Sequence, residues 1–147
     1  MSTEKNKMIA RRIPLEALNE GKLGVIDEIV SPDFVNWSPM PGLPDRGPEA
    51  LTQLVNTIRT AFPDICYTLD AEIAEGDKVV HLATARGTNT GSLMGLPATG
   101  KPATWIETHI LEFAEGKVLA HWGQVDLLGM MQQLGLAPRP EAAQNAA

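Results

Sequence analysis

Residues 101–126, KPATWIETHILEFAEGKVLAHWGQVD, decide the fold of this chain. The run AEGK at 114–117 predicts a tight turn, because glycine readily adopts the positive φ that a short hairpin needs. Both flanks are rich in β-branched and aromatic residues, which favours strands. The stretch therefore predicts a β-hairpin, and pairing Phe113 with Val118 sets its register.

This register divides the side chains of the hairpin between two faces. Directly opposed residues share a face, and side chains alternate along each strand. The first face carries the residues Trp105, Glu107, His109, Trp122, Gln124 and Asp126. The second face carries Ile106, Thr108, Ile110, His121 and Val125. A slip of one residue would exchange the two sets on one strand.

The first face has the composition of a small-molecule pocket. A carboxylate, an imidazole and indole rings side by side are typical of a site for acid–base chemistry. The same residues would also fit a solvated or dimer-forming sheet face with tryptophan as ordinary packing.

Length and composition exclude several classes of protein. A chain of 147 residues fits one domain, expected over 1–137, with 138–147 as a mobile tail that lacks a core pattern. The net charge of −6 argues against a nucleic acid or an anionic membrane as partner. The chain has a single cysteine and no apolar run of membrane length, and residues 1–12 are more polar than we expect of a secretory signal. We therefore expect a cytoplasmic protein.

Helical patterns come first along the chain and strand patterns follow. Apolar spacing predicts helices over 3–19, 22–30 and 48–62, and Pro14 predicts a kink or break in the first. Residues 34–37 are expected to be extended. The remaining elements are strands over 66–74 and 78–86, a long loop over 87–101, the hairpin, and a helix over 127–134.

This segregation of helices and strands predicts an α+β fold. A curved antiparallel sheet would wrap around the N-terminal helices and leave a cone with an open mouth, near which the long loop lies. One layer of helices covers only one face of a sheet. We therefore expect a homodimer in which a second subunit covers the outer face.

Four blocks of sequence carry a family resemblance. They are AFPDI at 61–65, GDKVV at 76–80, RGTNTGSLMGLPATGK at 86–101 and GKVLAHWGQVDLLGMMQQLG at 116–135. Their order and spacing resemble the SnoaL-like polyketide cyclase family over residues 5–136. The resemblance implies the cone-shaped, cystatin-like α+β roll that nuclear transport factor, limonene epoxide hydrolase and ketosteroid isomerase share.

The resemblance also implies a reaction. In such cyclases an aspartate on the last strand acts as acid–base catalyst of an intramolecular aldol closure, without metal or organic cofactor. Asp126 matches that aspartate, and His109 matches a family histidine on the preceding strand. The implied enzyme cyclises or isomerises a small hydrophobic molecule that contains a carbonyl group. The residues predicted to bind it are Trp37, Asn36, Trp105, Glu107, Trp122 and Gln124.

Some positions depart from the family or have another reading. Trp37 and Asn89 stand where many relatives have histidine, which makes the expected pocket more apolar. Asp126 would also serve as the N-cap of the final helix. His109 would also fit a sheet histidine satisfied by a neighbour, and His81 is expected to be structural.

Two other functions remain open at this point. Epoxide hydrolysis on such a fold needs an Asp-Arg-Asp arrangement, for which only Arg86 could supply the arginine. A non-catalytic binder of hydrophobic molecules is favoured by the loss of the two family histidines. No metal site is predicted, because His109 and His121 fall on opposite faces in this register.

Overall fold

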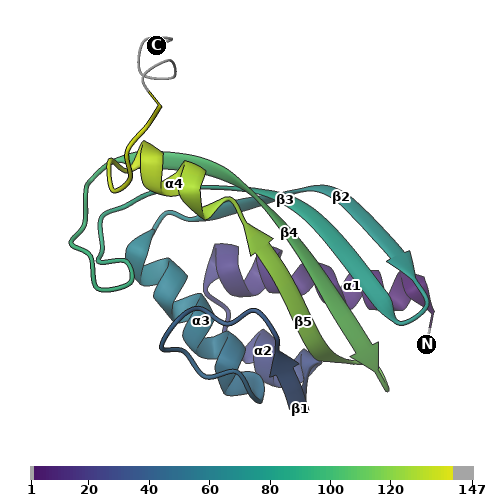
Figure 1. The fold of residues 1–147 in the computed structure, drawn as a ribbon. Coiled ribbons are helices and arrows are strands. Elements are labelled where there is room, and N and C mark those ends of the chain that lie inside the picture. Colours follow the sequence, from purple (N-terminus) through teal and green to yellow (C-terminus); the bar gives the residue numbers. More distant parts are fainter. Residues whose placement is uncertain (1, 141–147) are drawn as a thin grey trace.

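The structure is a computed structural model that describes residues 2–140 (Figure 1). Its helices and strands follow the predicted order. They are α1 (Thr3–Arg12), the π-helical segment η1 (Ile13–Leu18), α2 (Gly24–Ile29), β1 (Val30–Asn36), α3 (Pro48–Ala61), β2 (Cys66–Glu75), β3 (Lys78–Thr88), β4 (Pro102–Ala114), β5 (Lys117–Val125) and α4 (Leu127–Gln133).

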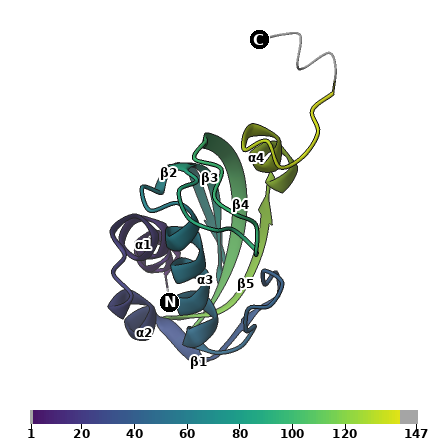
Figure 2. The ribbon, with the colours of Figure 1, turned by 90° about the vertical axis from the view of Figure 1, so that its left-hand side faces the viewer.

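The five strands form one curved sheet in the order β1-β5-β4-β3-β2. The pairs among β2, β3, β4 and β5 are antiparallel. Helices α1, α2 and α3 lie on the concave side of the sheet, and α4 follows the end of β5 (Figures 1 and 2). The predicted α+β class and the curved sheet around N-terminal helices are confirmed.

The first strand differs from the prediction. A short extended piece over 34–37 was expected, but β1 begins at Val30 and pairs in parallel with β5, through Val30 with Val118 and Asn36 with His121. The predicted helix over 22–30 therefore ends at Ile29. Pro32 explains this, because a proline disfavours helical backbone at the residue before it and lacks the N–H that a helix needs.

Pro14 interrupts the regular α-helix as predicted, but the chain stays helical through it. Helix α1 begins with Ser2, whose side chain accepts a hydrogen bond from the backbone N–H of Lys5 at 3.1 Å. The α-helix ends at Arg12, and the chain continues as the π-helical η1, whose second residue is Pro14. Because proline donates no backbone hydrogen bond, the regular α-helical ladder cannot pass through it.

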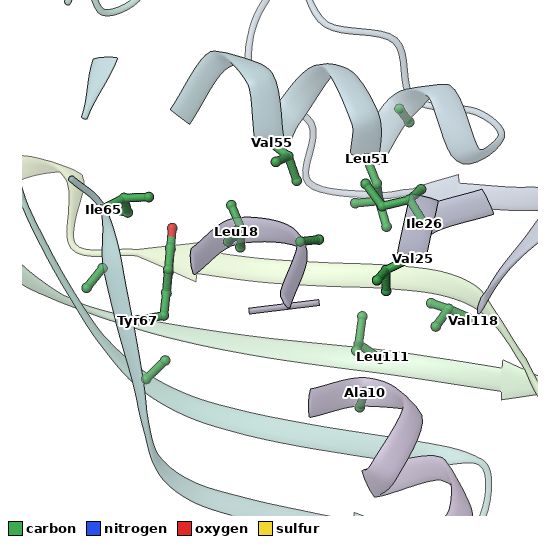
Figure 3. Packing of buried hydrophobic residues seen from close by; sticks show 14 of the residues in the cluster. Ala10, Leu18, Val25, Ile26, Leu51, Val55, Ile65, Tyr67, Leu111 and Val118 are labelled. Carbon is green, nitrogen blue, oxygen red and sulfur yellow. The ribbon is translucent and has the colours of Figure 1, made fainter. Parts of the chain in front are cut away.

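The core lies between the helices and the concave face of the sheet. Leu51 and Val55 of α3 pack with Val25 and Ile26 of α2 over Leu111 of β4 (Figure 3). These residues are nearly or fully buried. The other apolar positions of α3, Leu54 and Ile58, pack against the edge of the core and also line a cavity. The apolar stripe of α3 therefore serves both the core and the candidate site.

The register of the central hairpin was predicted wrongly beyond its turn. Phe113 pairs with Val118 as expected, but Glu112 pairs with Ala120, so Leu119 is an extra residue on β5. Such a β-bulge displaces every later pair by one residue. His109 therefore opposes Gly123 instead of Trp122. As a result His121 and Trp122 exchange faces relative to the prediction.

Two further findings concern the described residues as a whole. No helix within residues 2–140 is long and apolar enough to cross a membrane. The predicted mobile tail, 138–147, lies outside the described residues except for its first three, of which Pro138 accepts a hydrogen bond from Gln132 Nε2 at 3.1 Å.

Candidate active site

A cavity of about 290 Å³ lies between the concave face of the sheet and α3. Its walls are mostly apolar and come from several elements. They include Leu54 and Ile58 of α3, Trp105 of β4, Leu93 and Met94 of the long loop, and Met130 of α4. The loop thus lies against the cavity, as expected from its length.

The polar side of the cavity is a row of hydrogen-bonded side chains on β4 and β5. Glu107 Oε1 lies 2.7 Å from His109 Nε2. His109 Nδ1 lies 2.8 Å from His121 Nε2, and His121 Nδ1 lies 2.8 Å from Asn36 Oδ1. Glu107, His109 and His121 line the cavity. Asn36 lies behind them and ends the row.

The directions of these hydrogen bonds follow from the two ends of the row. Asn36 Oδ1 accepts from the backbone N–H of Ser38 at 3.0 Å, so this atom is an acceptor and His121 Nδ1 donates to it. Burial, and secondarily the charge of His109, lower the pKa of His121 to about 3. His121 is therefore neutral near pH 7, its Nε2 is an acceptor, and His109 Nδ1 donates to it.

The other end of the row is held by two donors. Trp105 Nε1 donates to Glu107 Oε2 at 2.6 Å, and the hydroxyl of Tyr67 donates to the same oxygen at 3.2 Å. Burial, with the charge of Glu107 as a second cause, raises the pKa of Tyr67 well above its usual value. Tyr67 therefore keeps its proton, and Oε2 of Glu107 stays an acceptor.

One proton remains to be placed, between Glu107 Oε1 and His109 Nε2. Because their 2.7 Å contact needs a proton, the pair is either a carboxylate with an imidazolium or a carboxylic acid with a neutral imidazole. In the carboxylate form one acceptor position of Oε1 has no donor among the described residues. The pair can therefore accept a proton at one atom and release one from another.

Gly123 makes room for this arrangement. A Cβ atom at this position would lie 2.8 Å from His109 Nδ1 and 2.9 Å from His121 Cε1. Contacts that short are almost never tolerated, so the two imidazoles can meet only beside a glycine. Their ring centroids are 5.0 Å apart.

Three of the predicted site residues meet in the cavity. Trp105, Glu107 and His109 line it, as their place on one face of β4 predicts. Trp105 also packs against Phe62, with ring centroids 5.0 Å apart. Glu107 is 5 % exposed and forms the centre of the polar row, so the alternative of a solvated carboxylate at the sheet edge is wrong for it.

The predicted residues of β5 do not line the cavity. Trp122 is 37 % exposed and Gln124 is also exposed, because the bulge at Leu119 turns both to the outer face. Asp126 is exposed as well, and its Oδ1 accepts from the backbone N–H of Gly129 at 3.0 Å. It is therefore the N-cap of α4, and the prediction that it shares a cavity with His109 was wrong.

The two predicted residues of the first strand also have other positions. Trp37 is 58 % exposed and is not part of the cavity wall, because it follows the end of β1. Asn36 is 3 % exposed and does not line the cavity either. Its carbonyl oxygen instead receives His121, which was not expected.

Asn89, Arg86 and His81 have structural surroundings. Asn89 is fully buried and does not line the cavity. The asparagine in place of the family histidine therefore leaves the polarity of the cavity wall unchanged. Arg86 is exposed and contacts Cys66 Sγ, so the arginine of the epoxide hydrolase alternative is not in the cavity. His81 bonds to Glu72 at 2.8 Å, and burial lowers its pKa despite that carboxylate.

Sequence reasoning missed Tyr67 and His121 as site residues. Tyr67 is the only tyrosine of the chain and faces inward on β2. The alternation of apolar and polar residues along β2 could have shown this orientation. His121 was assigned to the wrong face by the register. Within residues 2–140 no three histidine, cysteine, aspartate or glutamate side chains are arranged to hold a metal ion.

Comparison with known proteins agrees with this architecture. The family model of the SnoaL-like polyketide cyclases matches residues 8–134. The aklanonic acid methyl ester cyclase of Streptomyces peucetius is 32% identical over 136 residues, which cover 90% of this chain and 93% of that protein. The nogalonic acid methyl ester cyclase of Streptomyces nogalater is 29% identical over 122 residues, 82% of this chain and 91% of that protein.

A solved structure shares the fold over most of its length. The structure of TsrD from Streptomyces laurentii superposes with a TM-score of 0.84 and 28% identity, covering 93% of this chain and 99% of that one. The predicted enzyme class, a polyketide cyclase-like lyase or isomerase, agrees with the names of the two relatives above. On the extent of the family match and the identity to its members, this chain belongs to the SnoaL-like polyketide cyclase family.

Proposed function

We propose that this chain closes a ring by intramolecular aldol addition in a hydrophobic carbonyl substrate, and that its own side chains move the protons. The observation that carries the proposal is the 2.7 Å hydrogen bond between Glu107 Oε1 and His109 Nε2, which lies in a cavity with mostly apolar walls. Family membership supports the same class of reaction.

The proposed reaction uses the pair as both base and acid. Glu107 Oε1 takes the proton from the carbon next to a carbonyl group, and the electrons of that C–H bond form an enolate. The enolate carbon attacks a second carbonyl carbon of the same molecule and forms the new C–C bond. The resulting alkoxide takes a proton from the Glu107–His109 pair, which returns to its starting state. The product is an isomer of the substrate.

A direct assay tests this proposal. The purified protein is incubated with aklanonic acid methyl ester, the substrate named for one relative, and the mixture is separated by chromatography with mass detection. We expect a product of unchanged mass and a different retention time. If neither this ester nor a related β-keto polyketide ester is converted, the chain is better described as a non-catalytic binder of hydrophobic molecules.

We expect the enzyme to prefer an ester to the corresponding free acid. The residues that line the cavity, all within the described part of the chain, include no lysine or arginine. A substrate carboxylate would lose its hydration there without gaining a cationic partner, because His109 is already paired with Glu107. The expected kcat/KM for the free acid is lower by more than about ten-fold. Parallel assays of the ester and the acid measure this ratio, and equal values would contradict an uncharged site.

Asp126 is a second candidate for the base, supported by its match to the family aspartate and by Leu127, the next residue, which lines the cavity. We expect that Asp126 serves only as the N-cap of α4 and takes no part in proton transfer. Asp126→Asn should then turn over substrate at close to the normal rate, whereas Asp126→Ala should lose about 1 kcal/mol of stability. Initial rates and thermal melts measure both. A large loss of rate in Asp126→Asn at unchanged stability would assign the base to Asp126.

We also propose that the chain forms a homodimer through the outer face of the sheet. Helices cover only the concave face (Figure 2). The outer face exposes Ile73, Leu82, Ile106 and Trp122. Sedimentation velocity at micromolar concentration should show a dimer, and Ile106→Lys should shift it to monomer, whereas the control Met8→Lys on α1 should not. A stable wild-type monomer would rule this interface out.

A further inference from the structure

Asn36 has an unusual position for a polar residue of this site. It is 3 % exposed and does not line the cavity, so it has no direct contact with a molecule bound there. Its carbonyl oxygen nevertheless receives two donors, the backbone N–H of Ser38 at 3.0 Å and His121 Nδ1 at 2.8 Å. The backbone donor fixes which atom of the amide points toward His121, because only the oxygen can accept.

The charge of residue 36 decides the state of His121. A neutral amide accepts the proton of Nδ1 without stabilising a positive ring, so the buried imidazole stays neutral. A carboxylate in the same place would stabilise an imidazolium. His121 would then have protons on both nitrogens, and its Nε2 would donate toward His109 instead of accepting.

The state of His121 in turn decides the state of His109. With Nε2 of His121 as acceptor, His109 must hold a proton on Nδ1, and only its Nε2 can gain or lose one. That atom faces Glu107. If Nε2 of His121 were the donor, Nδ1 of His109 would have to be unprotonated in order to accept. The ring of His109 could then no longer be an imidazolium beside Glu107.

We infer that Asn36 is a positioning residue that acts through His121 to keep the mobile proton of the site on the Glu107 side of His109. This inference rests on the proposed function for its catalytic meaning, but the proton positions themselves are independent of any substrate. It replaces the predicted role of Asn36 as a substrate-binding donor.

The other ionisable groups near the row do not set this direction. Tyr67 of β2 donates to the far oxygen of Glu107. His81 of β3 lies opposite His109 in the sheet, but its Nε2 is bonded to Glu72, which in turn pairs with Arg11 of α1. Helix α3 contributes only the apolar Leu54 and Ile58 to this part of the cavity.

Nitrogen-15 NMR of the imidazole rings tests the inference without substrate. The chain has three histidines, so each ring can be assigned by single substitution. At pH 7 we expect His121 as the neutral form protonated on Nδ1, and His109 protonated on Nδ1. A wild-type His121 protonated on Nε2, whether neutral or charged, would overturn the inference whatever the activity.

Two variants test the effect on catalysis. Asn36→Asp should convert His121 to the imidazolium, remove the proton from His109 Nδ1, and lower kcat by on the order of 10²-fold or more. KM should change little, since residue 36 does not touch the cavity. Asn56→Asp, the same change at an exposed position of α3, is the matched control and should alter neither ring nor rate.

The double variant Asn36→Asp/His121→Gln distinguishes positioning from a packing defect. A glutamine amide cannot be charged, so its NH₂ group can donate to Asp and its oxygen can accept from His109, which restores the original direction. We expect kcat to recover by at least about ten-fold relative to Asn36→Asp. No recovery in a folded double variant would contradict the inference. If the wild type were inactive but both histidines had the expected protonation, the proposed function would be refuted and the inference about Asn36 would stand.

Discussion

Replacing Glu107 by glutamine is expected to abolish ring closure while the protein keeps its fold. The glutamine oxygen can accept from Trp105 and Tyr67 as Oε2 does now, and the glutamine NH₂ group can donate to His109 Nε2. All hydrogen bonds of the row would then be satisfied. The mobile proton would be gone, however, because an amide neither accepts nor releases a proton near neutral pH.

The expected loss in kcat is about 10²–10⁴-fold, the usual contribution of a positioned acid–base group. Thermal unfolding should show little change, since glutamine has the same shape as glutamate and keeps the hydrogen bonds of the row. Glu112→Gln is the matched control: it lies on the same strand and its carboxylate pairs with Lys78 at the surface. If Glu107→Gln kept more than about a tenth of the activity, the base would have to be another group.

The largest effect on stability is expected from Asn89→Ala. The fully buried side chain donates to the backbone oxygens of Ala61 and Gly91, and accepts from the N–H and the hydroxyl of Thr99. It thereby ties the end of α3 to both sides of the long loop. Alanine would leave the partly buried backbone oxygen of Gly91 and N–H of Thr99 without this partner, while Ala61 O would keep the N–H of Gly91. Each lost partner costs about 1–3 kcal/mol.

We expect Asn89→Ala to lose about 2–4 kcal/mol, or roughly 5–15 °C in Tm, for a chain of this size. Differential scanning calorimetry measures this, with Thr90→Ala at the exposed neighbouring position as control. The KM of any remaining folded enzyme should rise, because Leu93 and Met94 of the same loop line the cavity. A melt close to that of the control would show that the loop is held by other contacts.

The elements of this fold could be predicted because their signals are local. The period of α3, the turn at Gly116 and the proline at position 14 each act within a few residues, and all three appear where expected. The parallel pairing of β1 with β5 could not be predicted in this way. It joins residues about 85–90 positions apart, and nothing in either strand specifies its partner.

The candidate site could be predicted on β4 and not on β5, for one physical reason. Alternation from the turn places Trp105, Glu107 and His109 correctly, because β4 carries no extra residue against β3. On β5 the bulge at Leu119 reverses the alternation. A bulge is recognised by what packs on either side of it, and residues 117–122 contain no glycine or proline to mark it.

The bulge at Leu119 also bears on how such proteins diverge. Because Glu112 already pairs with Ala120, a deletion of Leu119 would keep every later pair, with His121 inward and Trp122 outward. If instead Leu119 paired with Glu112, the following residues would exchange faces, and Trp122 and Gln124 would take the place of His121 in the cavity. In this lineage the acid–base site therefore tolerates loss of one residue at the bulge, whereas substitutions that favour a regular ladder would remove the site while every site residue stayed in the sequence.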